Sequence, residues 1–393
     1  MQFDTSYFDA GIDRVGTNSE KWDDAAICPK GHIPLWVADM DFACAPAITQ
    51  ALAERAQHAS YGYTFMGPED IDAVRGFWQR RHGVTLAAED VGLLPSVVTG
   101  LRVCVDTLTK PGDGVIIQSP VYGPFFASVR DQGRMVMDSP LLRDDNGHYT
   151  MDLAHVEEFL QAGARLMILC NPHNPVGRCW TRDELEALSA LLTRYGCALV
   201  SDEIHADFVY KPHRFTSMLA LDNPPMPLVV LAAASKTFNV AGLQQSSLLC
   251  RDPELMKRIS ASLARNGVAA GNIFALAATR AAYTACDDWL DGLVAYLDGS
   301  REVLRDALAR LLPKARLTPI EATYLGWVDM RAYGMTNEVL YQHCMEAGVV
   351  PTNGTFFGQE SGEGFLRINF GCPRSQLLAG LEQPDEGRIT GLQ

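Results

Sequence analysis

The central part of the chain alternates between two patterns of apolar and polar positions. Short, uninterrupted apolar runs predict buried strands at 114–118, 166–170, 198–201 and 228–234. Longer segments between them carry apolar residues three and four positions apart, which predicts amphipathic helices, for example at 151–160 and 181–195. Strands that alternate with helices form a mostly parallel, doubly wound α/β sheet. Ligands of such sheets bind beyond the carboxyl ends of the strands.

The two ends of the chain follow other patterns. Residues 1–35 show neither period and are interrupted by proline, so we expect an irregular surface arm. The apolar run Pro34–Phe42 then predicts a strand that ends on two aspartates, and a helix follows from Pro46. From about residue 285 the chain changes to long helical segments and a few apolar runs.

These patterns predict a division into domains. Residues 1–45 would form the N-terminal arm and part of a small domain, residues 46–284 a large domain, and residues 285–393 a smaller α+β domain. The tail after Gln383 has no apolar pattern, and we expect it to be frayed.

Composition excludes several classes of function. The 393 residues are 47% hydrophobic and 20% charged, as in an ordinary globular protein, and their net charge of −14 argues against a nucleic-acid partner. Ten cysteines without a C-x-x-C pair predict reduced, mostly buried thiols of a cytoplasmic protein, with no metal site. We expect no signal peptide and no membrane association, because no apolar run is long enough.

Three of the predicted strands are followed by polar side chains that could take part in binding or catalysis. Asn174 follows the strand at 166–170, Asp202 the strand at 198–201, and Lys236 the strand at 228–234. A lysine dehydrated at the end of a buried strand has a larger share of the neutral, nucleophilic amine. Such an amine can bond to an aldehyde or ketone carbon.

Asparagine, aspartate and lysine at successive strand ends resemble the pyridoxal-phosphate (PLP) enzymes of fold type I, the aspartate aminotransferase superfamily. The segments Pro34–Phe42 and Ile368–Arg374 are similar to those of its bacterial cystathionine β-lyase and carbon–sulfur lyase subgroup. The resemblance spans nearly the whole chain. It implies PLP as cofactor, an amino-acid substrate, and a homodimer whose active sites are shared between subunits.

The resemblance also implies roles for single residues. Lys236 would bind the cofactor aldehyde and then take the Cα proton of the substrate. Asp202 would keep the ring nitrogen protonated, Asn174 would donate to the phenolic oxygen, and Tyr122 would stack on the ring. His205 stands where many relatives carry a tyrosine, and both a direct role and a packing role stay open.

The cofactor phosphate requires a separate group of residues. The start of a helix offers free N–H groups, and the residues that match the family's phosphate tripeptide are Thr99, Gly100 and Leu101. Ser235 would assist, and Tyr63 would reach the phosphate of the partner subunit or serve only in packing. Typical aminotransferases carry an arginine where this chain has Gln244, a departure that favours the lyase subgroup.

The remaining assignments concern the substrate. Arg367 would clamp the substrate carboxylate with its planar fork, and the backbone at Val37 and Ala38 would lie beside it.

The catalytic residues themselves do not decide between β-elimination and transamination. The subgroup resemblance favours a carbon–sulfur β-lyase that converts a thioether amino acid, such as L-cystathionine, into a thiol, pyruvate and ammonia, a step of methionine biosynthesis. An aminotransferase of class I/II is the alternative. A regulatory or binding protein on the same fold is a third hypothesis. Nothing in the sequence supports it, because no sign of a degraded active site is seen.

Overall fold

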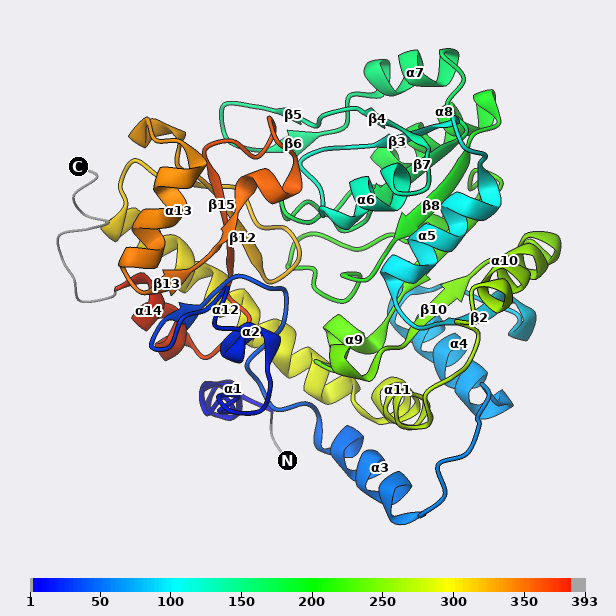
Figure 1. The fold of residues 1–393 in the computed structure, drawn as a ribbon, viewed down its shortest axis with the longest axis horizontal. Coiled ribbons are helices and arrows are strands. Elements are labelled where there is room, and N and C mark those ends of the chain that lie inside the picture. The colour runs from blue at the N-terminus through cyan, green and yellow to red at the C-terminus, as the bar shows by residue number, and fades with distance from the viewer. Residues whose placement is uncertain (1–2, 383–393) are drawn as a thin grey trace.

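A seven-stranded sheet, here called the large sheet, forms the centre of the computed structural model, which describes residues 3–382 (Figure 1). Its strands lie in the order β2-β10-β9-β8-β7-β3-β4. They are β2 (Val91–Leu94), β3 (Gly114–Ile117), β4 (Met135–Asp138), β7 (Leu166–Cys170), β8 (Ala198–Asp202), β9 (Leu228–Ala232) and β10 (Ser246–Leu249). Only β10 runs antiparallel to its neighbours in this sheet. The expected mostly parallel α/β sheet is therefore confirmed.

Successive residues of the large-sheet strands point to opposite faces and enter two separate cores. Ile168 and Val200 pack with the helices on one face, whereas Met167 and Leu199 pack with those on the other. Because both faces are covered, these strands are apolar at every position, which is the pattern seen in the sequence.

Helices of one core are α5 (Val97–Leu108), α6 (Pro124–Arg130) and α10 (Pro253–Arg265). Helices that contribute to the opposite core are α4 (Pro68–His82), α7 (Leu153–Gln161), α8 (Arg182–Tyr195) and α11 (Ile273–Ala285). The helix α3 (Pro46–Gln57) packs on α11 at the edge of the molecule (Figure 1).

A second, smaller sheet lies beside the large one and is antiparallel throughout. It is called the small sheet, and its order is β11 (Arg316–Leu317), β12 (Leu325–Asp329), β15 (Phe365–Asn369) and β14 (Thr352–Asn353). The helices α12 (Asp287–Leu311), α13 (Asn337–Glu346) and α14 (Arg374–Leu381) accompany it (Figure 1). Trp327 and Phe365 stack across β12 and β15 with their ring centroids 4.9 Å apart.

Two two-stranded pairs complete the strands of the described chain. They are β1 (Ile33–Pro34) with β13 (Val349–Val350), and β5 (Leu142–Arg143) with β6 (Tyr149–Thr150). The domain boundaries near residues 45 and 285 stay predictions. The expected fraying after Gln383 falls outside the described residues.

The predicted strand at Pro34–Phe42 is wrong beyond its first residue. Strand β1 ends at Pro34, and the part from residue 36 to 42, here called the 36–42 segment, has no regular secondary structure. Most of its carbonyls are bound by side chains instead of by a neighbouring strand. The Asn369 amide donates to the carbonyls of Val37 and Asp39, at 2.6 and 2.8 Å. An apolar run therefore marked burial here, not strand pairing.

The N-terminal arm is more ordered than its sequence pattern indicated. It forms two short helices, α1 (Thr5–Asp9) and α2 (Glu20–Asp23), and Phe8 is fully buried against aromatic rings of the core. Lys21 is also buried, with its Nζ 2.7 Å from Asp41 Oδ2 and 2.8 Å from the Asp39 carbonyl. This ion pair ties the arm to the 36–42 segment.

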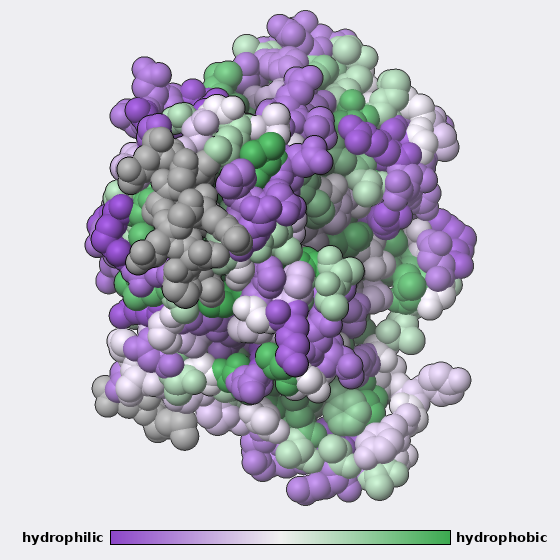
Figure 2. Space-filling view, turned by 60° about the vertical axis from the view of Figure 1, so that its left-hand side comes forward, coloured by the Kyte–Doolittle hydropathy of each residue, from purple (hydrophilic) through white to green (hydrophobic). Residues whose placement is uncertain are grey.

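The surface matches the acidic, polar composition. Hydrophilic residues predominate on the face shown in Figure 2, and hydrophobic residues form smaller groups between them. Nine of the ten cysteines are buried, as expected. Among residues 3–382, no helix combines the length and the apolar character needed to cross a membrane.

We predict that Asp41→Ala destabilises the protein by about 3–5 kcal/mol, because it leaves the buried ammonium of Lys21 without a counter-charge. The same substitution removes acceptors from Arg14, Trp22 and Gln376. The midpoint of denaturant unfolding measures the change. Asp13→Ala, at an exposed position of the same arm, should stay within about 0.5 kcal/mol of the wild type. Equal midpoints for the two variants would contradict the structural role of the ion pair.

Candidate active site

A cavity of about 600 Å³ opens beyond the carboxyl ends of the central strands of the large sheet. Its wall also includes the start of α5, residues 36–39, the short helix α9 (Ala234–Thr237), and residues of β14 and β15. The large sheet, the small sheet and the N-terminal arm all contribute to it. Its volume suits a small-molecule site.

The three strand-end residues all line this cavity, because the strands are in matching register. Cys170 of β7 pairs with Asp202 of β8, which pairs in turn with Leu231 of β9. Asn174, Asp202 and Lys236 therefore lie at one edge of the sheet and face one space.

Lys236 lies in α9, directly after β9. Its Nζ donates to the Ala38 carbonyl at 2.6 Å, and that oxygen also accepts from the Tyr324 hydroxyl at 3.1 Å. Burial lowers the pKa of the Lys236 amine, while the nearby Asp39 carboxylate opposes this change. The result is an amine held in place by hydrogen bonds and closer to its nucleophilic form than a surface lysine.

Asp202 is only 4% exposed, and burial raises the pKa of its carboxyl to about 7. The Ile204 N–H donates to its Oδ1 at 3.1 Å, and Lys236 also favours the charged form. A buried carboxylate with few donors has a strong preference for a cationic partner, since burial penalises an uncompensated charge.

His205 is buried in the same wall. Burial, helped by the charges of Lys236 and Arg367, lowers the pKa of its imidazole to about 3, so the ring is neutral at physiological pH. The ring packs edge-on against Tyr324 with centroids 6.0 Å apart. Its Nδ1 is buried and has no hydrogen-bond partner among the described residues.

Arg367 of β15 enters the cavity from the side of the small sheet. It donates to Asn174 Oδ1 at 3.1 Å, to the Trp36 carbonyl at 2.7 Å and to Thr352 Oγ1 at 3.2 Å. In the part of the chain that the structure describes, no carboxylate forms an ion pair with it, and its Nε has no partner. Burial accordingly lowers the pKa of Arg367 to about 10. A buried cation without an anion is suited to bind a ligand carboxylate.

The start of α5 differs in detail from the prediction. The residues that line the cavity are Ser96, Val97 and Val98, not the predicted Thr99, Gly100 and Leu101. Leu101 is fully buried in the hydrophobic core, and a side chain at Gly100 would lie 2.7 Å from Leu94 Cδ1.

The hydrogen bonds at this helix start explain the shift. The Thr99 N–H is already bound by the Ser96 hydroxyl and the Gly100 N–H by the Ser96 carbonyl. The free N–H groups of the helix therefore belong to Val97 and Val98, directly after Ser96 and two residues before the predicted Thr99.

The other predicted residues divide into two groups. Those that line the cavity are Val37, Ala38, Tyr122, Ser235 and Gln244. Burial raises the pKa of the Tyr122 phenol, whose ring lies 6.1 Å from that of Phe356. Tyr63 lies outside the cavity with a fully exposed side chain, so its reach into a partner subunit stays a prediction.

Several lining residues were not among the predicted site residues. They are Glu20, Trp36, Asp39, Thr352, Phe356, Gln245 and Ser246. Most come from loops or from the arm, where neither apolar period nor strand ends mark a position. The Ser246 hydroxyl and Gln245 Oε1 lack partners in the described protein and add polar groups near the helix start.

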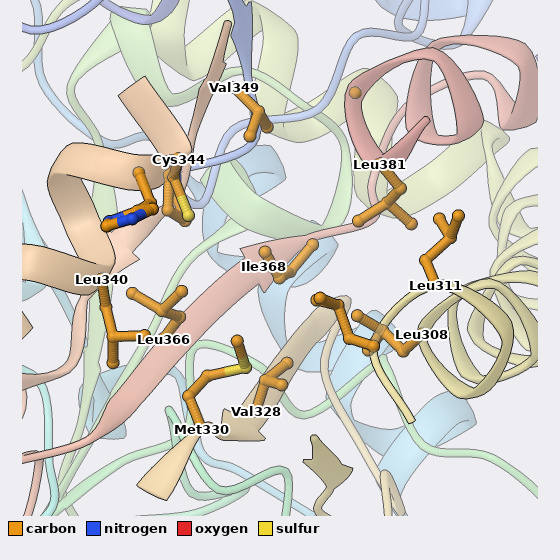
Figure 3. A pocket seen from close by; sticks show the side chains of 14 residues that line it. Leu308, Leu311, Val328, Met330, Leu340, Cys344, Val349, Leu366, Ile368 and Leu381 are labelled. Carbon is orange, nitrogen blue, oxygen red and sulfur yellow. The ribbon is translucent and has the colours of Figure 1, made fainter. Parts of the chain in front are cut away.

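A second cavity lies within the small sheet and its helices, and it is chemically unlike the first. It measures about 40 Å³, and apart from His343 and Cys344 its lining is apolar. Figure 3 shows side chains of Leu308, Leu340 and Leu381 converging from three helices around it. It is too small for a cofactor.

The sequence and fold of this chain define its family. The model of the aminotransferase class I and II family matches residues 30–383, and the chain belongs to that family. It is 41% identical to cystathionine beta-lyase PatB of Bacillus subtilis over 381 residues, which cover 96% of this chain and 98% of the relative.

Solved structures agree with this assignment. Cystalysin of Treponema denticola, which contains a pyridoxal 5′-phosphate cofactor, matches with a TM-score of 0.92 and 30% identity over 98% of each chain. The PLP-bound C–S lyase of Staphylococcus hominis matches with a TM-score of 0.88 and 29% identity, over 98% of this chain and 97% of the other. The protein is thus a PLP-dependent enzyme similar to carbon–sulfur lyases, and its cofactor is pyridoxal 5′-phosphate.

The residues of the cavity fit this cofactor. The amine of Lys236 suits an aldehyde, the buried Asp202 suits a protonated ring nitrogen, and the unpartnered Ser246 hydroxyl near the start of α5 suits a phosphate. With Gln244 in place of an arginine, neutral donors would hold most of the phosphate charge.

We predict that Asp202→Asn becomes more stable relative to the wild type as pH rises from 4 to 7 in the cofactor-free protein. The Asp202 pKa is about 7 in the folded chain and 3.8 in the unfolded chain, so only the folded wild type holds this proton between those values. The contribution of this proton to wild-type stability is therefore full below pH 3.8 and is lost as pH rises through 7. Denaturant midpoints at pH 5 and pH 8 measure the effect. A constant difference between the two proteins at both pH values would contradict the raised pKa.

Proposed function

We propose that this enzyme is a carbon–sulfur β-lyase of the cystathionine β-lyase type, which acts on thioether amino acids such as L-cystathionine or a cysteine S-conjugate. The observation that carries the choice of reaction is the 41% identity to cystathionine beta-lyase PatB across 96% of the chain. The cavity supports an amino-acid substrate, because it combines a buried carboxylate-binding arginine with a lysine of lowered pKa.

Arg367 binds and orients the substrate. Its guanidinium is held by Asn174, Thr352 and the Trp36 carbonyl, so the fork is fixed before a substrate arrives. A preorganised, buried fork binds a carboxylate through two parallel hydrogen bonds and fixes the orientation of Cα.

Lys236 is the proton acceptor. Bound PLP supplies the electron sink that stabilises negative charge on the substrate Cα. The neutral amine of Lys236 then takes the Cα proton, and the lowered pKa of this amine increases the fraction of molecules able to do so. When the proton moves, the Ala38 carbonyl receives the resulting ammonium, as it receives Nζ in the structure.

Elimination completes the reaction. The electron pair of the former Cα–H bond forms a Cα–Cβ double bond, and the Cβ–S bond breaks with its electron pair on sulfur. The thiolate takes a proton and leaves as the thiol, homocysteine when the substrate is cystathionine. Water hydrolyses the three-carbon remainder to pyruvate and ammonia, so one water is the sole co-reactant and no oxidant is consumed.

A homodimer and a cytoplasmic location belong to the same proposal. Tyr61, Tyr63 and Phe65 expose large aromatic side chains on the loop between α3 and α4, a surface suited to a second copy of the chain. In that arrangement Tyr63 would reach the phosphate site of the partner.

We predict pyruvate release from L-cystathionine by the wild type and none above background by Lys236→Ala, because the variant lacks the proton acceptor. Pyruvate formation coupled to lactate dehydrogenase measures this directly. Lys257→Ala, which changes an exposed lysine, serves as the control and should keep full activity. Amino transfer to added keto acids without pyruvate release would show an aminotransferase instead.

We predict that Arg367→Lys lowers kcat/KM about 10- to 100-fold, mainly through a higher KM. Lysine keeps the charge but loses one of two charge-assisted hydrogen bonds to the carboxylate, each worth about 1.5–3 kcal/mol. Steady-state kinetics with L-cystathionine measure the change. An unaltered KM would place the substrate carboxylate elsewhere.

A further inference from the structure

One carboxylate of the active-site cavity has no partner in the protein. Glu20, the first residue of α2, lines the cavity together with Lys236 and Arg367. Within residues 3–382 its side chain forms no hydrogen bond or ion pair, in contrast to Asp39, which is paired with Arg14 at 2.6 Å. In the described part of the chain, Glu20 therefore has no structural ion pair that would account for its charge in the cavity.

The arm holds Glu20 in a defined place. Its neighbour Lys21 is anchored in the buried ion pair with Asp41, and Trp22 donates to the same carboxylate at 2.9 Å. Asp23 accepts from the backbone N–H groups of Gly16 and Ser19, at 2.9 Å each. The turn that carries Glu20 is thus fixed on both sides, although its own carboxylate is exposed to the cavity.

The charge of Glu20 acts inside the site. It adds to the burial effect that raises the pKa of Tyr122, and it counters the burial effect that lowers the pKa of Lys236. It does not neutralise Arg367, which has no carboxylate partner among the described residues. The cavity consequently offers a cation and an anion at separate places.

These two charges match a substrate with two charged ends. Arg367 accounts for the α-carboxylate, and Lys236 and Asp202 are engaged with the cofactor. Glu20 remains for the part of the substrate beyond sulfur, where an uncompensated carboxylate attracts a cation and repels an anion.

We propose that Glu20 binds a positively charged group at the far end of the sulfur substituent and thereby selects thioether amino acids that carry a distal ammonium. L-Cystathionine belongs to this class, whereas S-alkyl cysteines do not. The inference rests on the proposed β-lyase function and defines the substrate class of that site.

Two substrates of nearly equal shape test the selection with the PLP-loaded enzyme. S-(2-Aminoethyl)-L-cysteine ends in an ammonium group, and S-propyl-L-cysteine ends in a methyl group at the same position. The measured quantity is the ratio of their kcat/KM values for pyruvate release. Glu20→Gln should lower this ratio about fivefold to tenfold, as expected for one charge-assisted hydrogen bond in a partly solvated site. Glu20→Lys should lower it further, because it repels the ammonium.

Ionic strength gives an independent readout. Rising salt should lower the ratio in the wild type, since exposed charge pairs are screened within about 10 Å at 0.1 M salt, and should change it little in Glu20→Gln. Asp13→Asn removes an exposed charge of the same arm outside the cavity and should leave both the ratio and its salt dependence as in the wild type.

The outcomes separate the two proposals. Equal loss of activity towards both substrates in Glu20→Gln, with an unchanged ratio, would overturn the selection role and show that Glu20 acts through Lys236. No pyruvate from either substrate with the wild type would overturn the β-lyase function, and this inference with it.

Discussion

Side-chain hydrogen bonds to the backbone of the 36–42 segment hold the active site together. The segment is buried without a neighbouring strand, and an unpaired buried carbonyl would be costly, so other elements must supply the donors. Asn369 comes from the small sheet, Asn239 from the loop after α9, Lys21 from the arm and Lys236 from α9. One irregular strip of backbone thus joins the arm, the large sheet and the small sheet at the wall of the cavity.

The electrostatics of the cavity follow from this assembly. Because three parts of the chain enclose the site, the side chains of Asp202 and Arg367 are largely removed from water before any ligand arrives. Burial lowers the pKa values of Lys236 and Arg367 and raises that of Asp202, so each group is poised for a partner of opposite charge or for proton transfer. Such preorganisation reduces the rearrangement that binding and reaction require.

Sequence patterns predicted the large sheet well because strands buried on both faces must be apolar at every position. The order of Asn174, Asp202 and Lys236 at the strand ends then placed them at one edge. The prediction was wrong for the 36–42 segment, since an apolar run indicates burial but not which donors satisfy the backbone. The residues of the α5 start that line the cavity, and the carboxylate of Glu20, were not predicted for a related reason. Their positions depend on helix register and on tertiary docking of the arm, which local periodicity does not encode.

The central claim is that Lys236, at the meeting point of these elements, holds the cofactor. Borohydride reduction of the PLP-loaded enzyme fixes the cofactor to the lysine that binds it, and peptide mass mapping identifies that lysine. The account predicts the phosphopyridoxyl group on the peptide that contains Lys236 and on no other. Its presence on a different lysine, such as Lys211 or Lys257, would contradict the account.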